Sequence, residues 1–168
     1  MAPFFAAGAT FFLAWAASKS IKEQREERIE ERQRRALERI RYWAEEVIEL
    51  VTRPTRHKLL GLRKLELQAL LHVGNYKALG ILKDAELIDH NLELRVRLGN
   101  LALFKFDAML GTEEDIAAFK AKYHSTDTIN PIRDATELVE VKKELLPVLI
   151  EVINLVTERL VPRGTGTK

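Results

Sequence analysis

The chain opens with an uncharged stretch that changes abruptly into a densely charged one. Residues 2–18 carry no charged side chain, whereas residues 19–42 contain nine basic and six acidic side chains. No glycine or proline lies between Gly8 and Pro54. Because these two residue types oppose helix formation most strongly, the pattern predicts one long helix that runs through both stretches to about Val51.

The uncharged stretch, residues 2–18, is expected to cross a membrane. As a helix it would span about 25 Å, which is short but sufficient for the core of a bilayer. A secretory signal peptide would begin with basic residues, and none precedes this stretch. Basic side chains follow it instead, which places the amino terminus outside and the C-terminal domain in the cytoplasm. The sequence therefore predicts a single-pass protein of the cell membrane or an inner membrane.

Two kinds of residue lie on opposite sides of this predicted membrane helix. The aromatic ones gather around Gly8 and are expected to face lipid; they are Phe4, Phe5, Phe11, Phe12 and Trp15. Small side chains on the other side let helix backbones approach closely. We expect this side to pack between subunits or to line a pore, and it holds Ala6, Thr10, Leu13, Ala14 and Ala17. A lone anchor helix that holds these residues by chance is the alternative.

The charged stretch sorts its basic and acidic residues onto two sides of a thin apolar line. The basic side holds Arg25, Arg28, Arg32, Arg35 and Arg39, and the acidic side holds Glu23, Glu26, Glu27 and Glu30. Identical parallel helices can pair the basic side of one chain with the acidic side of the next. Such a contact between unlike faces closes as a ring, so we expect a homo-oligomer of three or more chains. Binding of the basic side to anionic lipid head groups and a simply solvated helix are the alternatives.

An apolar seam begins at Leu37 and continues through Ile40, Ala44, Val47 and Val51 at spacings of three and four. This spacing is typical of a short coiled coil or of core packing. Residues 19–51 are therefore assigned to a juxtamembrane helix that continues into a cytoplasmic helical bundle, residues 56–159. The predicted fold class is all-α.

Turn signals divide the rest of the chain into further helices. Pro54 predicts a turn before a leucine-rich helix, and Gly74 with Asn75 is a stop signal for that helix. The next helical region runs to Leu110. Its apolar face is expected to hold Leu87, Ile88, Leu92, Arg95, Leu98 and Ala102.

Capping residues mark the predicted starts of two later helices. Thr112 and Asp115 are spaced as in a capping box and begin a helix that reaches about Tyr123. Asn130 and Pro131 predict the start of the last helix. Pro147 should bend that helix or break it.

Composition and motifs point away from catalysis. The net charge of +2 gives no argument for a nucleic-acid partner, and the absence of cysteine removes disulfides and thiolate metal sites. Asp89, His90 and Glu93 could form part of a metal site, but a solvated acidic face explains them equally well. No nucleotide, zinc or serine-hydrolase motif occurs. We therefore expect no enzyme, no catalytic residue, no metal and no cofactor.

The last residues are set apart from the fold. Leu160 to Gly164 resemble a thrombin cleavage site, and Thr165 to Lys168 resemble vector sequence. Residues 160–168 are therefore read as the remnant of a tag.

The function that this pattern favours is self-association of a membrane protein as a parallel ring. Such a ring can form an ion-conducting pore, in which Lys19, Lys22 and Arg25 at the inner mouth would favour anions. The alternative is a membrane-tethered scaffold or adaptor that conducts nothing and binds a protein partner through its helical bundle. That alternative requires an exposed apolar groove on the bundle.

Overall fold

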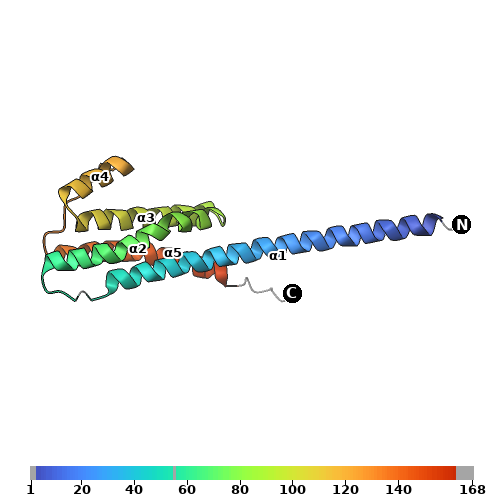
Figure 1. Cartoon of the computed structure of the whole chain (residues 1–168), viewed down its shortest axis with the longest axis horizontal. Coiled ribbons are helices and arrows are strands. Elements are labelled where there is room, and N and C mark those ends of the chain that lie inside the picture. Colours follow the sequence, from blue (N-terminus) through green and yellow to red (C-terminus); the bar gives the residue numbers. More distant parts are fainter. Residues whose placement is uncertain (1–2, 55, 162–168) are drawn as a thin grey trace. The chain divides into compact units, whose positions relative to one another are not determined.

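The computed structural model describes residues 3–54 and 56–161, with the side chains of residues 3–14, 73–76 and 79 left out of the description. These residues form five helices, α1 (Pro3–Thr52), α2 (Leu60–Glu86), α3 (His90–Leu110), α4 (Glu113–Tyr123) and α5 (Ala135–Leu160) (Figure 1). The described ranges contain no strand. The all-α prediction is confirmed.

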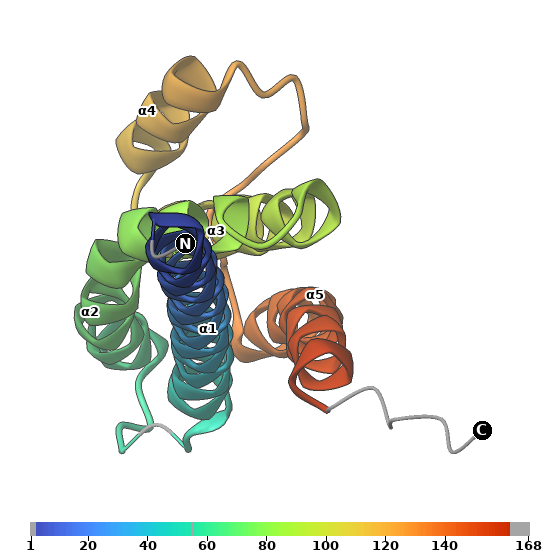
Figure 2. The ribbon, with the colours of Figure 1, turned by 90° about the vertical axis from the view of Figure 1, so that its right-hand side faces the viewer.

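The chain divides into two units, residues 1–35 and residues 36–168. Helix α1 passes from the first into the second without interruption. In the second unit, the last part of α1 packs with α2, α3 and α5 around one core, and we call this unit the helical domain (Figure 2). Its largest fully buried side chains include Trp43, Phe106, Leu71, Leu92 and Leu149.

The apolar seam of α1 belongs to this core. Ile40, Ala44, Val47 and Val51 are fully buried, and Trp43 is 1% exposed. They share one hydrophobic cluster with side chains of α2, α3 and α5. The seam is therefore core packing within one chain, which decides between the two interpretations that its spacing allowed.

Ion pairs hold the helices of the domain to one another. Glu46 of α1 accepts hydrogen bonds from Lys77 of α2, the shorter of them 2.8 Å. Arg95 of α3 forms a pair with Glu151 of α5, with both guanidinium nitrogens 3.2 Å from carboxylate oxygens. Each pair therefore joins two neighbouring elements of the bundle.

Helix α4 packs beside α3 on a small cluster of its own. Ile116 and Phe119 of α4 are buried there together with Ala108 and Ile129 (Figure 1). The capping box predicted at its start is confirmed: Thr112 N donates to Asp115 Oδ2 at 2.7 Å, and Asp115 N donates back to the Thr112 hydroxyl. Both exchanges satisfy backbone donors that the first helical turn leaves free.

Two predicted boundaries are wrong, and of the bend or break expected at Pro147 the break does not occur. Helix α2 continues through Gly74 and Asn75, because packing of a long helix overrides the weak local preference of two residues. Helix α5 contains Pro147 without a break. It begins at Ala135, after Asp134 has accepted hydrogen bonds from Thr136 N and Glu137 N, and not at Pro131.

The late start of α5 has a tertiary cause. Ile132 is buried, and its backbone N donates to the carbonyl oxygen of Met109 at 2.9 Å. Lys64 Nζ donates to the Ile132 carbonyl oxygen at 3.0 Å. These two hydrogen bonds hold Ile132 against α3 and α2, in the segment that precedes the Asp134 cap.

No helix in the described part of the chain combines the length and the apolar character needed to span a bilayer. Within α1 the uncharged run covers residues 3–18, about 24 Å at 1.5 Å per residue, whereas the hydrocarbon core is roughly 30 Å thick. This finding does not support the membrane helix predicted for residues 2–18. The side chains of Phe4, Phe5, Ala6, Thr10, Phe11, Phe12, Leu13 and Ala14 lie outside the described residues, so the roles predicted for them stay predictions.

Candidate assembly and binding surfaces

The first unit presents a helix face that nothing in the described chain covers. From Trp15 to Arg35 every side chain is exposed except Ala16, which is half-buried. Three large apolar side chains are among them, since Trp15, Ile21 and Ile29 each keep more than half of their surface exposed. An exposed helix of this kind is suited to pair with another helix.

Some of the sorted charges are paired within α1 itself. Lys19 lies 3.9 Å from Glu23, and Lys22 lies 3.9 Å from Glu26. Arg35 pairs with Glu31 four residues before it. Exposed pairs at this spacing contribute about 0.3–0.5 kcal/mol each, so they support the helix without fixing its charges to another element.

A second set of charges is left unpaired. Among residues 3–54 and 56–161, the side chains of Arg25, Arg28 and Arg32 form no ion pair, and neither do those of Glu27 and Glu30. At about 100° per residue the three arginines lie within roughly 60° of arc. Ile29 lies about 40° from Arg25, and Glu30 and Glu27 lie about 100° and about 160° beyond Ile29. The helix therefore carries two unpaired charge sets of opposite sign on different sides.

Arg39 departs from the predicted basic side. Its Nε and Nη2 atoms donate to the two carboxylate oxygens of Asp84 on α2, at 2.7 and 2.6 Å. These hydrogen bonds raise the pKa of Arg39. The structure therefore places Arg39 inside the helical domain, while Arg25, Arg28 and Arg32 remain on the exposed helix with Lys19, Lys22 and Ala17.

An apolar groove of about 520 Å³ lies between α3, α4 and α5. Leu98 and Leu101 of α3, which are 41% and 39% exposed, line it together with Val148, Phe119 and Tyr123. Two charged pairs line it as well, Arg95 with Glu151 and Lys105 with Asp127, the second at 3.5 Å. Polar residues of the segment after α4, His124, Ser125 and Thr126, also line the groove.

The groove was missed at the level of sequence because α3 carries leucines on two sides. Of the residues expected on one apolar face, Leu92 is buried and Ala102 packs partly buried against the core, but Leu98 is exposed. The buried row also includes Val96, Gly99, Leu103 and Phe106. Leu94, Leu98 and Leu101 form a second, exposed row. Spacing alone does not tell which of two apolar rows meets the core.

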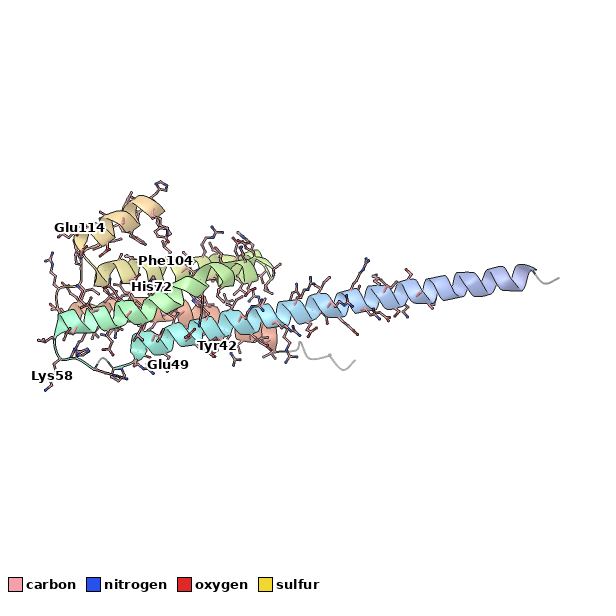
Figure 3. All side chains as sticks on the ribbon, in the orientation of Figure 1. Tyr42, Glu49, Lys58, His72, Phe104 and Glu114 are labelled. Atoms are coloured by element: carbon pink, nitrogen blue, oxygen red, sulfur yellow. The ribbon has the colours of Figure 1, made fainter. Side chains whose placement is uncertain are left out.

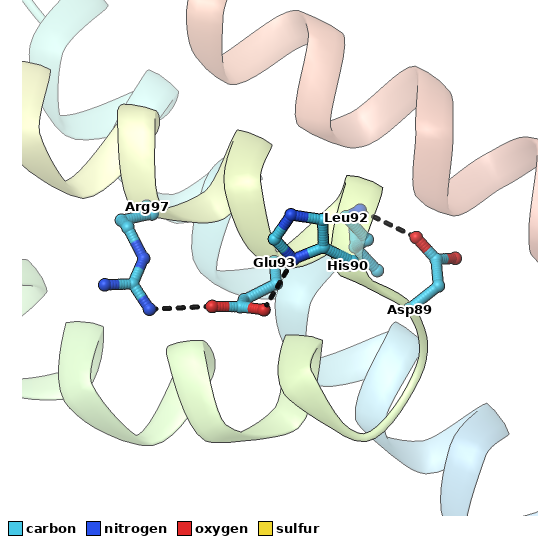
Figure 4. Close-up of polar contacts among 5 residues, drawn as sticks. All are labelled: Asp89, His90, Leu92, Glu93 and Arg97. Carbon is cyan, nitrogen blue, oxygen red and sulfur yellow. Dashed lines mark hydrogen bonds and ion pairs between the residues drawn. The ribbon is translucent and has the colours of Figure 1, made fainter.

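Polar residues at the start of α3 form a structural cluster (Figure 4). Asp89 Oδ1 accepts a hydrogen bond from Leu92 N at 2.8 Å, and Glu93 lies between His90 and Arg97 at 3.2 and 2.7 Å. The hydrogen bonds from Arg97 and then from His90 lower the pKa of Glu93. No group of metal-binding side chains is found in the described ranges, and this cluster is explained by capping and ion pairing.

Comparisons with protein families, with curated proteins and with solved structures gave no match.

Proposed function

We propose that this protein is a self-associating scaffold in which the exposed part of α1 joins parallel copies and each copy displays its helical domain. The observation that carries the proposal is the pair of unpaired charge sets on α1, Arg25, Arg28 and Arg32 on one side and Glu27 with Glu30 on the other. In parallel copies the arginines of one chain face the glutamates of the next.

Exposed apolar positions near the arginines strengthen this arrangement. Ile29, about 40° of arc from Arg25, is 55% exposed in the single chain, and Ile21, which lies within the arc of the three arginines, is 52% exposed. Burying such side chains against a neighbouring copy contributes about 25 cal/mol for each Å² removed from water. Charge pairing at the flanks then selects the parallel orientation and the register.

A pair of charge reversals tests this proposal. One variant carries Arg28→Glu and Arg32→Glu, which makes both sides of the helix acidic. The other carries Glu27→Arg and Glu30→Arg, which makes both sides basic. We expect each variant alone to have a lower mass by light scattering than the wild-type chain, and an equimolar mixture of the two to recover the mass of the assembly.

The matched control reverses two exposed charges of the helical domain, Lys83→Glu and Lys122→Glu, and should leave the mass unchanged. Circular dichroism would verify that every variant keeps its helix content. The mixture can recover the mass of the assembly only if the acidic helix of one variant pairs with the basic helix of the other. A mixture that stays at the mass of its components would contradict the proposed contact.

A second function, binding of a protein partner, is favoured by the groove between α3, α4 and α5. An open apolar groove between helices accepts the apolar face of an amphipathic helix. A photoreactive amino acid at position Leu101 should give discrete adducts in cells, and Leu98→Asp should remove them. The same label at Leu87, which is 63% exposed at the end of α2, is the control, and identical adducts at both positions would exclude the groove.

The membrane anchor and the anion-favouring pore stay predictions. Both depend on residues 2–14, whose side chains lie outside the described part of the chain. No contact among the described residues adds support to them, so the scaffold does not require either.

A further inference from the structure

The first turns of α2 expose leucines that a helix of a bundle would be expected to bury. Leu59, Leu62 and Leu65 are 69%, 44% and 62% exposed, while Leu67 and Leu71 further along are buried. The three exposed leucines line a shallow groove of about 630 Å³ whose other wall includes Leu110 and Asp115. They form a row of apolar side chains at the end of the helical domain.

The surrounding chain is basic and free of acidic residues. Between Glu49 and Glu66 there is no aspartate or glutamate, whereas Arg53, Arg56, Lys58, Arg63 and Lys64 all lie in this interval. Figure 3 shows Lys58 at the turn between α1 and α2, at the end of the helical domain. The exposed leucines and the basic side chains therefore follow one another along the chain. At the end of this interval the Glu66 carboxylate accepts a hydrogen bond from Arg56 N at 3.1 Å.

The fold leaves most of these positive charges without a counter-charge. In the described ranges, Arg56, Lys58 and Arg63 form no ion pair, and Arg53 has only a long contact of 3.8 Å with Glu49. Lys64 Nζ is held by the carbonyl oxygen of Ile132. Asp115, the acidic residue of the groove wall, is engaged in the capping box of α4.

We propose that this surface, formed by Arg56, Lys58, Leu59, Leu62, Arg63 and Leu65, binds a membrane that contains anionic lipids. Leucines that project from a turn can enter the boundary between head groups and acyl chains, while neighbouring basic side chains meet the negative head groups. Nucleic acid would satisfy the cations and leave the leucines in water. The combination of both residue types is what selects a lipid surface.

This inference is independent of the proposed assembly, although assembly would strengthen it. Several copies in one oligomer present several such surfaces to the same membrane, and each further contact is then intramolecular. A weak single contact can therefore give firm attachment of the whole scaffold.

Sedimentation of the full chain with lipid vesicles tests the inference. Vesicles of phosphatidylcholine alone are compared with vesicles that also contain phosphatidylserine. The variant Arg56→Gln, Lys58→Gln should bind the anionic vesicles about 30-fold more weakly, since each basic residue near the surface contributes about 1 kcal/mol. The variant Leu59→Ser, Leu62→Ser, Leu65→Ser should also lose affinity.

Matched controls separate this surface from the rest of the chain. Lys83→Gln with Lys122→Gln removes the same charge elsewhere, and Leu87→Ser removes an equally exposed leucine at the other end of α2. Residues 2–18 and the basic side of α1 are unchanged in every variant. Any vesicle binding that they contribute is therefore the same in the test and control variants. Equal vesicle binding by the test and control variants would overturn the inference.

Two further results would also overturn it. Unchanged vesicle binding of the triple leucine variant would show that no side chain enters the membrane. Tighter binding of the chain to polyglutamate or to RNA than to anionic vesicles would assign the basic cluster to a soluble partner.

Discussion

Arg39 of α1 donates two hydrogen bonds, of 2.7 and 2.6 Å, to the carboxylate of Asp84 of α2, although the two residues are 45 positions apart in the sequence. The Asp84 side chain is only 14% exposed. Four residues earlier Arg35 pairs within its own helix, and from Ala36 onward α1 contributes to the core. The Arg39–Asp84 pair therefore marks the place where α1 changes from an exposed helix to a member of the bundle.

Replacing Arg39 by Met should weaken the helical domain modestly. The change removes both hydrogen bonds to Asp84 and leaves its carboxylate, which is 14% exposed, without this partner. Because the Arg39 side chain is 56% exposed, solvent screening limits the loss to about 1 kcal/mol. Urea denaturation should show this as a lower midpoint with an unchanged slope.

The control for this change is Arg41→Met. Arg41 pairs with Glu45 at 3.0 Å on the surface of the same helix, so its removal should cost less than about 0.5 kcal/mol. Equal losses for both variants would show that the pair between α1 and α2 adds nothing beyond an ordinary surface pair.

Asp89 should make the stability of the domain sensitive to acid. Burial on its own raises the pKa of Asp89, but hydrogen bonds from Arg159 Nε at 2.8 Å and from Leu92 N outweigh it, and the net pKa is lowered. A carboxyl group with a lowered folded-state pKa stabilises the fold above its unfolded pKa, and this contribution disappears as the pH falls through the folded pKa. Asp89 therefore contributes at neutral pH and not in strong acid.

Asp89→Asn isolates this effect, because asparagine caps a helix about as well as aspartate. The variant should be less stable than the wild type at pH 7, by less than about 1 kcal/mol for this partly exposed pair. The difference should shrink as the pH drops below about 4. Thermal denaturation across this range would measure it, and a difference that stays constant with pH would show that the charge is not responsible.

Two helical glycines should respond oppositely to enlargement. A Cβ added at Gly80 would meet nothing within 4 Å, whereas one at Gly99 would lie 3.6 Å from both Trp43 Cη2 and Leu149 Cδ2. Gly80→Leu should therefore stabilise the domain by up to about 1 kcal/mol through helix propensity. Gly99→Leu should destabilise it by about 1–3 kcal/mol, because the extra atoms would be forced into the core.

Gly99→Ala is the informative control, since its added methyl group reaches only ordinary contact distance. It should be neutral or slightly stabilising. Urea midpoints for the three variants would decide the matter, and a stable Gly99→Leu variant would contradict the close packing of α3 on Trp43.

Gly111 has a different role, at the start of α4. A Cβ at this position would lie 2.2 Å from Asp115 Oδ2. Gly111→Ala should therefore displace Asp115 and break the capping box, which costs about 0.5–2 kcal/mol. Hydrogen exchange should be faster in residues 113–123 and unchanged in the core of α5; protection of α4 equal to that of the wild type would argue against this coupling.

Much of the fold follows from local pattern. The end of α1, the seam from Ile40 to Val51 and the capping box of α4 were all predicted from spacing and cap residues, and the structure confirms them. These features depend on contacts within one turn or on one well-defined apolar row. The sequence contains nearly all of the information that they need.

Features set by tertiary contacts could not be predicted in this way. The extended backbone at Ile132 depends on Met109 and Lys64, and the exposure of Leu59, Leu62 and Leu65 depends on where neighbouring helices end. The engagement of Arg39 by Asp84 likewise required the packing of α1 on α2. Both surfaces of the helical domain are defined by such contacts, whereas the charge sets on α1 were visible in the sequence.

The mass of the wild-type full chain in solution, measured by light scattering over a range of concentrations and salt, tests the central claim most directly. The arginines and glutamates of α1, which are unpaired within one chain, predict a discrete assembly of at least three times the 19.3 kDa chain mass. High salt should dissociate this assembly because exposed charges are screened. A mass of 19.3 kDa at every concentration would show that the exposed face of α1 does not join copies of this chain.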